Sequence, residues 1–192
     1  WKPLQSDDVE KIINSYDVDQ YLVERIEDKG FIDYDTLCKE MESSELLSHT
    51  NKSILQQTFK AIEAELYDLA LAGVVIVFDG VLAEATSNAS TNISRRIEDI
   101  RNKMEKLSDE EWECLGEKEI TVFGMYTTWT KTMEGFQRYS EFDKPETEPK
   151  SLNRHWIAHG RKTTTATKLD CCKMINALYG LLCIGNPALL SS

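Results

Sequence analysis

Glycine and proline are scarce in this chain, with nine and four among its 192 residues. Such low numbers exclude a collagen-like chain and a Pro/Gly-rich disordered one, and the 41% hydrophobic fraction favours a globular protein. The length suits one domain with a sizeable core and at most a small extra lobe. No methionine precedes Trp1, so we expect either a trimmed chain or a piece of a longer polypeptide, and a missing N-terminal domain or partner protein is a candidate partner.

The cysteines lack the features of a secreted or zinc-binding protein. Their number is odd, no two have CxxC spacing, and no signal peptide precedes them. This pattern points to a reducing compartment, so we predict a cytoplasmic protein with free, buried thiols. The five residues are Cys38, Cys114, Cys171, Cys172 and Cys183.

Long hydrophobic runs are also missing. The longest uncharged apolar run covers residues 69–78, about half of the ~20 residues that a bilayer-spanning helix needs. Asp68 and Asp79 close it at its two ends. The sequence therefore predicts no membrane span.

Positive charge is scarce overall, and the formal net charge is −11. Such a chain repels polyanions at long range, which argues against a general nucleic-acid coat protein. Residues 150–173 differ, because they hold six cations and one anion, or +5, so the rest of the chain sums to −16. A small phosphate-binding cleft would produce this basic segment, and so would solvated lysines near helix ends. Its charged residues are Lys150, Arg154, Arg161, Lys162, Lys168, Asp170 and Lys173.

No strand period competes with the helical period of the strong apolar repeats, so we predict an all-α protein with four or more core helices. Residues 1–50 carry thirteen acids against five bases. We interpret them as a small, acidic, helical N-terminal extension, with a second amphipathic segment after Gly30. Residues 51–192 form the main helical bundle.

The clearest helical pattern lies in residues 53–84. An unbroken helix there would be too long for a compact domain, so we expect a break between Glu65 and Gly73 and hence two helices. Gly73 and Gly80 continue the apolar stripe with small residues, which predicts a close contact with a neighbouring helix. The large members of the stripe are Leu55, Phe59, Ile62, Leu66 and Leu69.

Further helices are expected at 93–107, 108–116 and 122–139, followed by a charged, proline-containing loop at 141–151. The repeat in the third helix is Val122, Tyr126, Trp129, Met133 and Phe136. A final, broadly apolar helix at 169–182 should stop at Gly185 and Pro187.

The segment SLNRHWIAHGRKT, residues 151–163, contains two of the three histidines of the chain. Ser151 or Asn153 can cap a helix of about two turns that Gly160 stops, with Trp156 and Ile157 toward the core. On such a helix His155 and His159 are four residues apart and share a face.

Three interpretations of these histidines remain open. The spacing His-x-x-x-His is half of a zinc site, whose third ligand would have to come from Asp170, Cys171 or Cys172. The histidines and Trp156 can also serve packing and hydrogen bonding alone. The third interpretation is metal-free RNA cleavage, which needs a base, an acid and a cation for the charge that grows on phosphorus.

The segment also resembles a known superfamily. Arg154, four intervening residues and His159 fit the Arg-x4–6-His signature of the HEPN superfamily, and NRHWIAHG is similar to the NRHxILHG form of bacterial HEPN-like proteins. The motif opens the final bundle helix in that family, and an apolar helix is expected after it here. Residues 66–84 resemble an earlier family helix that ends in an acid–Gly pair, here Asp79 and Gly80. The resemblance covers roughly residues 54–184.

The resemblance implies an antiparallel α-helical bundle that dimerises and cuts RNA without metal or another cofactor, often in phage defence or in a toxin system. It implies that Arg154 binds the scissile phosphate and that His159 transfers protons. Asn153, His155 and Asp79 would support them, and we predict that Arg161 and Lys162 bind phosphate. The alternative is a non-catalytic HEPN-like module for dimerisation or for binding RNA or nucleotides.

Overall fold

The computed structural model describes about three fifths of the chain, and its contacts divide the sequence into two units, 1–43 and 44–192. Contact units need not be independent domains, so the expected boundary at residue 50 stays a prediction. The described residues are 34–87, 93–106, 108, 129, 133, 135–136, 144–149 and 152–185.

The first unit contributes one described helix, α3 (Tyr34–Ser43). It lies in the amphipathic segment that the sequence predicted after Gly30. Near its end, the hydroxyl of Ser43 donates a hydrogen bond of 2.7 Å to the carbonyl oxygen of Glu40, which satisfies one of the last carbonyls of the helix.

The second unit opens with two helices in place of one, as predicted. Helix α4 (His49–Glu63) starts at the N-cap Ser48, whose hydroxyl accepts a hydrogen bond of 3.2 Å from the Asn51 amide. Helix α5 (Tyr67–Thr86) follows after three residues. The break begins one residue before the expected range, at Ala64, and Glu65 there adopts a left-handed φ of 61°.

The apolar stripe that was expected to continue through this break is interrupted by it. Its members on α4, such as Leu55 and Phe59, are buried, whereas Leu66 is 55% exposed and Leu69 is 65% exposed. The left-handed residue changes the direction of the chain, so α5 does not keep the helical phase of α4. The expectation of one continuous stripe was wrong.

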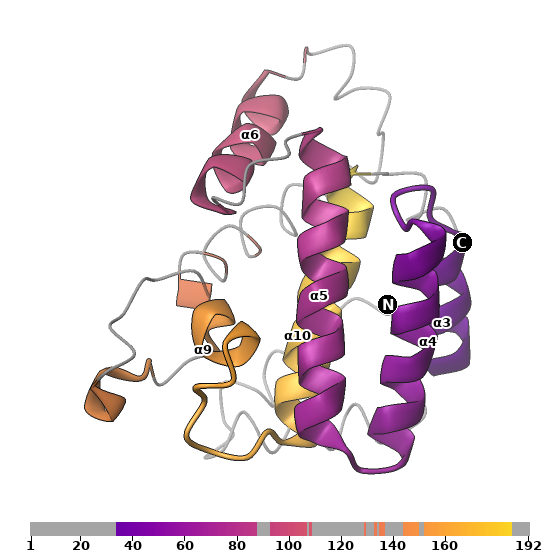
Figure 1. Ribbon diagram of the computed structural model, residues 1–192. Helices are drawn as coiled ribbons and strands as arrows, with labels where there is room; N and C mark the ends of the chain where they lie inside the picture. Colours follow the sequence, from indigo (N-terminus) through magenta and orange to yellow (C-terminus); the bar gives the residue numbers. More distant parts are fainter. Residues whose placement is uncertain are drawn as a thin grey trace, which may run out of the picture. The chain divides into compact units, whose positions relative to one another are not determined.

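Helix α5 is the centre of the second unit and packs against α4, α6 (Ile93–Glu105), α9 (Arg154–Ala158) and α10 (Lys168–Gly185). Figure 1 shows α4, α5 and α10 side by side. The predicted close helix contact is present, since a Cβ atom added at Gly73 would collide with the Thr58 hydroxyl of α4, and one at Gly80 would collide with the Asn51 amide. These glycines let α4 approach α5 closely.

By length and composition alone, α5 could also cross a bilayer, because it has 20 residues and a mean hydropathy of 1.9. Of its apolar stretch, 56% is buried inside the protein, as expected of a central core helix. Among the described residues no other helix meets these criteria.

Aromatic side chains from the segment 122–139 cover one side of α5. Trp129, Met133 and Phe136 are helical and buried, as their repeat predicted. The ring centroid of Phe78 on α5 lies 6.2 Å from that of Trp129 and 5.7 Å from that of Phe136. The rest of that repeat, and residues 109–116 of the helix predicted at 108–116, lie outside the described residues.

The final helix α10 occupies the expected place. A reciprocal cap opens it, because the amide of Thr167 donates to the Asp170 carboxylate at 2.9 Å and the amide of Asp170 donates to the Thr167 hydroxyl at 3.2 Å. It ends at Gly185, where the sequence predicted a stop. All described elements are helical and none is a strand, which confirms the all-α prediction for this part of the chain.

We expect Gly73→Ala to destabilise the protein by about 1–3 kcal/mol, since overpacking outweighs the better helix propensity of alanine. Adding Thr58→Ala should restore most of the loss, because the added Cβ would then face only a Cβ atom, 3.5 Å away. Urea denaturation of the two single variants and the double variant measures both effects. A Gly73→Ala variant at least as stable as the parent would contradict the tight contact.

Candidate functional site

Helix α9 is short and depends on its caps. The buried side chain of Asn153 is its N-cap, and the amide oxygen accepts hydrogen bonds from His155 N at 3.0 Å and Trp156 N at 3.4 Å. Of the two residues predicted as the N-cap, Asn153 therefore caps the helix, and Ser151 lies outside the described residues. Gly160 has a φ of 61° and ends the segment as predicted. With five residues, α9 is shorter than the expected two turns.

A charged pair joins α9 to the middle of α5. Arg154 Nε lies 2.9 and 2.8 Å from the two carboxylate oxygens of Asp79, and its Nη2 donates to Oδ2 of the same group. Both side chains are largely buried, at 19% and 25% exposure, so water screens the pair less than it would at the surface. Asp79 was expected to orient the motif, and the structure places it directly against Arg154.

The two histidines lie together as the helical spacing predicted. Their rings are parallel within 1°, with centroids 6.3 Å apart. His159 is exposed and His155 is half-buried. Burial, then the nearby Arg154 and His159, lower the pKa of His155 below its usual 6.5, while Asp79 opposes this shift. His155 therefore favours its neutral form more than an ordinary imidazole does.

Lys162 does not point into solvent. Its ammonium donates to the carbonyl and hydroxyl oxygens of Thr164, both at 2.8 Å, and to the carbonyl of Thr165 at 3.3 Å. The Asp170 carboxylate lies 3.9 Å away. Three acceptors match the three N–H donors of an ammonium, so phosphate could bind Lys162 only by displacing them. Arg161, in contrast, is exposed.

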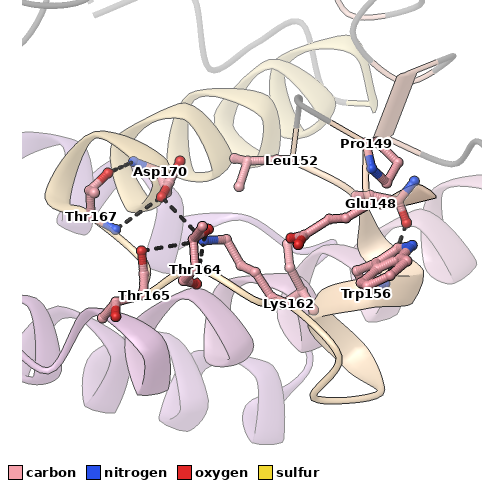
Figure 2. A pocket seen from close by; sticks show the side chains of 11 residues that line it. Glu148, Pro149, Leu152, Trp156, Lys162, Thr164, Thr165, Thr167 and Asp170 are labelled. Carbon is pink, nitrogen blue, oxygen red and sulfur yellow. Dashed lines mark hydrogen bonds and ion pairs between the residues drawn. The ribbon is translucent and has the colours of Figure 1, made fainter. Parts of the chain in front are cut away.

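A cavity of about 250 Å³ lies between α9, the following loop and the start of α10 (Figure 2). Glu148 enters it from the loop after the short 3-10 helix η2 (Pro145–Thr147) and accepts hydrogen bonds from the amide of Thr163, at 3.1 Å, and from its hydroxyl. Trp156 and Ile157 line the cavity from α9. The sequence did not reveal this cavity.

The basic segment is less positive in space than in sequence. Asp79 pairs with Arg154, Glu148 binds Thr163, and the Asp68 carboxylate accepts a hydrogen bond of 2.7 Å from the Ala166 amide. These acids lie outside residues 150–173, so the local count of +5 overstates the charge that a ligand would meet.

Arg96 on α6 is a residue that the sequence analysis missed. Its side chain is buried, with 8% exposure, and its Nη1 donates a hydrogen bond of 3.3 Å to the backbone carbonyl of Asp79. Asp79 thus meets one arginine through its carboxylate and another through its carbonyl. The only sequence signal was a basic amphipathic run, in which Arg95 and Arg96 look equally solvated.

A histidine metal site finds no third ligand here. Among the residues that the structure describes, no three His, Cys, Asp or Glu side chains are grouped to hold an ion. Burial, then the neighbouring Cys172, Asp170 and Asp68, raise the pKa of the Cys171 thiol to about 12. The thiol donates a hydrogen bond of 3.4 Å to the Tyr67 carbonyl oxygen, as a buried structural cysteine would.

No protein family model, curated protein or solved structure matches this chain. The likeness to the HEPN superfamily therefore depends on the motifs quoted above.

We expect Asp79→Asn to destabilise the protein by about 1.5–3 kcal/mol, because it leaves a largely buried guanidinium without a charged partner. Arg154→Met should lower the free energy of unfolding by less in the Asp79→Asn background than in the parent. A double-mutant cycle in urea measures this coupling. Additive effects of the two substitutions would show that the pair contributes nothing.

The lowered pKa of His155 should appear in an NMR titration of its ring proton as a midpoint below 6.5. Because the unfolded state then binds more protons than the folded one, the free energy of unfolding should fall as the pH drops through this region. Arg154→Met should move the midpoint upward by removing a nearby cation. A parent midpoint at or above 6.5 would contradict the stated environment.

Proposed function

We propose that this protein is a metal-independent endoribonuclease of the HEPN type. The observation that supports the proposal most is that one short helix carries a carboxylate-held arginine and two parallel imidazoles. Asp79 orients Arg154, His155 lies on α9, and His159 is the C-cap of that helix, about one turn away. These are the groups that metal-free RNA cleavage needs in one place.

In this reaction, a base takes the proton from the ribose 2′-hydroxyl, and the resulting oxygen attacks the adjacent phosphorus. The bond from phosphorus to the 5′-oxygen breaks, and an acid protonates the leaving oxygen. The products are a 2′,3′-cyclic phosphate and a free 5′-hydroxyl. Imidazoles suit both steps because they exchange protons near neutral pH.

Arg154 is assigned to the phosphate. Asp79 uses Nε and Nη2, and no described residue binds the remaining nitrogen, Nη1. The N–H groups of Nη1 can donate to a phosphoryl oxygen as negative charge grows on it. Asp79 would hold the guanidinium in one orientation, so less conformational entropy is lost when RNA binds.

His159 is assigned to proton transfer because it is exposed and can reach a substrate. His155 is a supporting group whose lowered pKa leaves it a neutral hydrogen-bond partner. Asn153 acts through the backbone, since it caps the helix that carries these groups.

A two-fold dimer is part of the proposal. Cleavage needs an acid and a base, and each chain has one Arg154/His159 motif, so a seam between two copies would supply both. The proposal also includes location in the cytoplasm, from the odd cysteine number without CxxC spacing, and a role in antiviral defence or a toxin system, from the HEPN resemblance.

One observation favours a non-catalytic module instead. The carboxylate of Asp79 neutralises Arg154, and such a pair could simply fasten α9 to α5. In that case the protein would bind RNA or a second copy of itself without cutting.

The test incubates end-labelled RNA, both uracil-rich and structured, with the protein in excess EDTA. We expect cleavage by the parent, a loss of about 10²-fold or more in His159→Ala, and a similar loss in Arg154→Lys, which keeps the charge but not the planar fork. His49→Ala, which removes an exposed histidine at the start of α4, is the matched control and should cut normally.

Sedimentation of the active sample should show a dimer. Cleavage that persists in His159→Ala, or that EDTA abolishes in the parent, would overturn the mechanism. RNA binding without cleavage by the parent would favour the non-catalytic module.

A further inference from the structure

Arg96 carries a buried charge that forms no ion pair with a carboxylate among the described residues. Its Nη1 donates to the Asp79 carbonyl, but its Nε is buried and has no hydrogen-bond partner among the described residues. A buried N–H without an acceptor typically costs about 1–3 kcal/mol, and more when the group is charged. An anion bound close by would offset part of that cost through its charge.

The charges around Asp79 also leave an excess. Arg96 from α6 and Arg154 from α9 both bind this residue, whose single carboxylate compensates one of them. The cluster of Asp79, Arg96 and Arg154 therefore has a net charge of +1 in a protein of net charge −11. Within low-dielectric surroundings this charge attracts an anion more strongly than a solvated lysine would.

The donors that remain suit an oxyanion. Arg154 offers Nη1, and its side chain is 19% exposed, so a ligand can approach it. Arg96 adds its charge from the more buried position. Guanidinium groups with N–H donors to spare are the usual partners of phosphate oxygens.

We propose that Arg96 and Arg154 form a two-arginine oxyanion site organised by Asp79, and that it takes a phosphate group. Arg154 makes the direct contact, and Arg96 supplies the uncompensated charge behind it. That the phosphate belongs to RNA rests on the proposed function. The binding of phosphate itself does not, so the two can be tested apart.

The test uses the His159→Ala variant, in which cleavage plays no part, and follows the arginine Nε–H signals by ¹⁵N NMR. Inorganic phosphate is added at constant ionic strength, with chloride as the reference anion. We expect the Arg96 and Arg154 signals to shift together along one binding curve. The Arg101 signal should stay in place, because Arg101 lies partly exposed on the same helix and pairs with Glu98 at 3.2 Å.

Two substitutions on α6 then test the role of Arg96. Arg96→Met, which keeps much of the side-chain volume, should weaken phosphate binding about tenfold or more, and the matched control Arg101→Met should leave it unchanged. Arg96→Lys should retain part of the affinity, because it keeps the charge without the fork. If Arg96→Met does not fold, the parent titration and Arg96→Lys still decide the question.

Equal affinity in Arg96→Met and Arg101→Met, or signal shifts that chloride reproduces, would overturn the inference. Phosphate binding that depends on Arg96, in a protein that never cuts RNA, would uphold this site and reject the nuclease. RNA cleavage with unchanged KM and kcat in Arg96→Met would uphold the nuclease and reject the role of Arg96 in phosphate binding.

Discussion

The arrangement around α9 depends on the carboxylate and carbonyl of one residue, Asp79. Its carboxylate receives Arg154 from α9 and its carbonyl receives Arg96 from α6, so one position on the central helix fastens two others. A five-residue helix has no stability of its own in water. The pair with Asp79, the Asn153 cap and the burial of Trp156 therefore hold the segment that presents the histidines.

The same helix separates two environments. Trp156 and Ile157 turn toward the cavity between the loop and α10, whereas His155 and His159 share another face and keep parallel rings. Arg154 points to α5. A substrate that bound the histidines would thus contact α9 and its C-cap on that side. The ammonium of Lys162 already donates hydrogen bonds to the threonine-rich loop. This division is why the phosphate is assigned to the arginines of α6 and α9 and not to Lys162.

Much of the fold was predictable because it depends on local patterns. The two helices before residue 87, the final helix, the caps at Asn153 and Gly160 and the close approach at Gly73 all follow from apolar period, small residues and capping preferences. The apolar stripe was not predictable across the turn, since the left-handed φ of Glu65 changes the helical phase. The sequence does not predict this change of helical phase, because glutamate rarely adopts a left-handed backbone conformation.

By itself, the sequence determined which of the described helices form and that His155 and His159 lie together, because residues one turn apart on a helix are neighbours in any fold. Only the tertiary structure decided which charges meet. Asp79 is 75 residues from Arg154 and 17 from Arg96, and the packing of α6 and α9 on α5 brings the three together. Electrostatic interaction depends on distance in space and on burial, so the charge count of residues 150–173 could reveal neither the partner of Arg154 nor the buried Arg96.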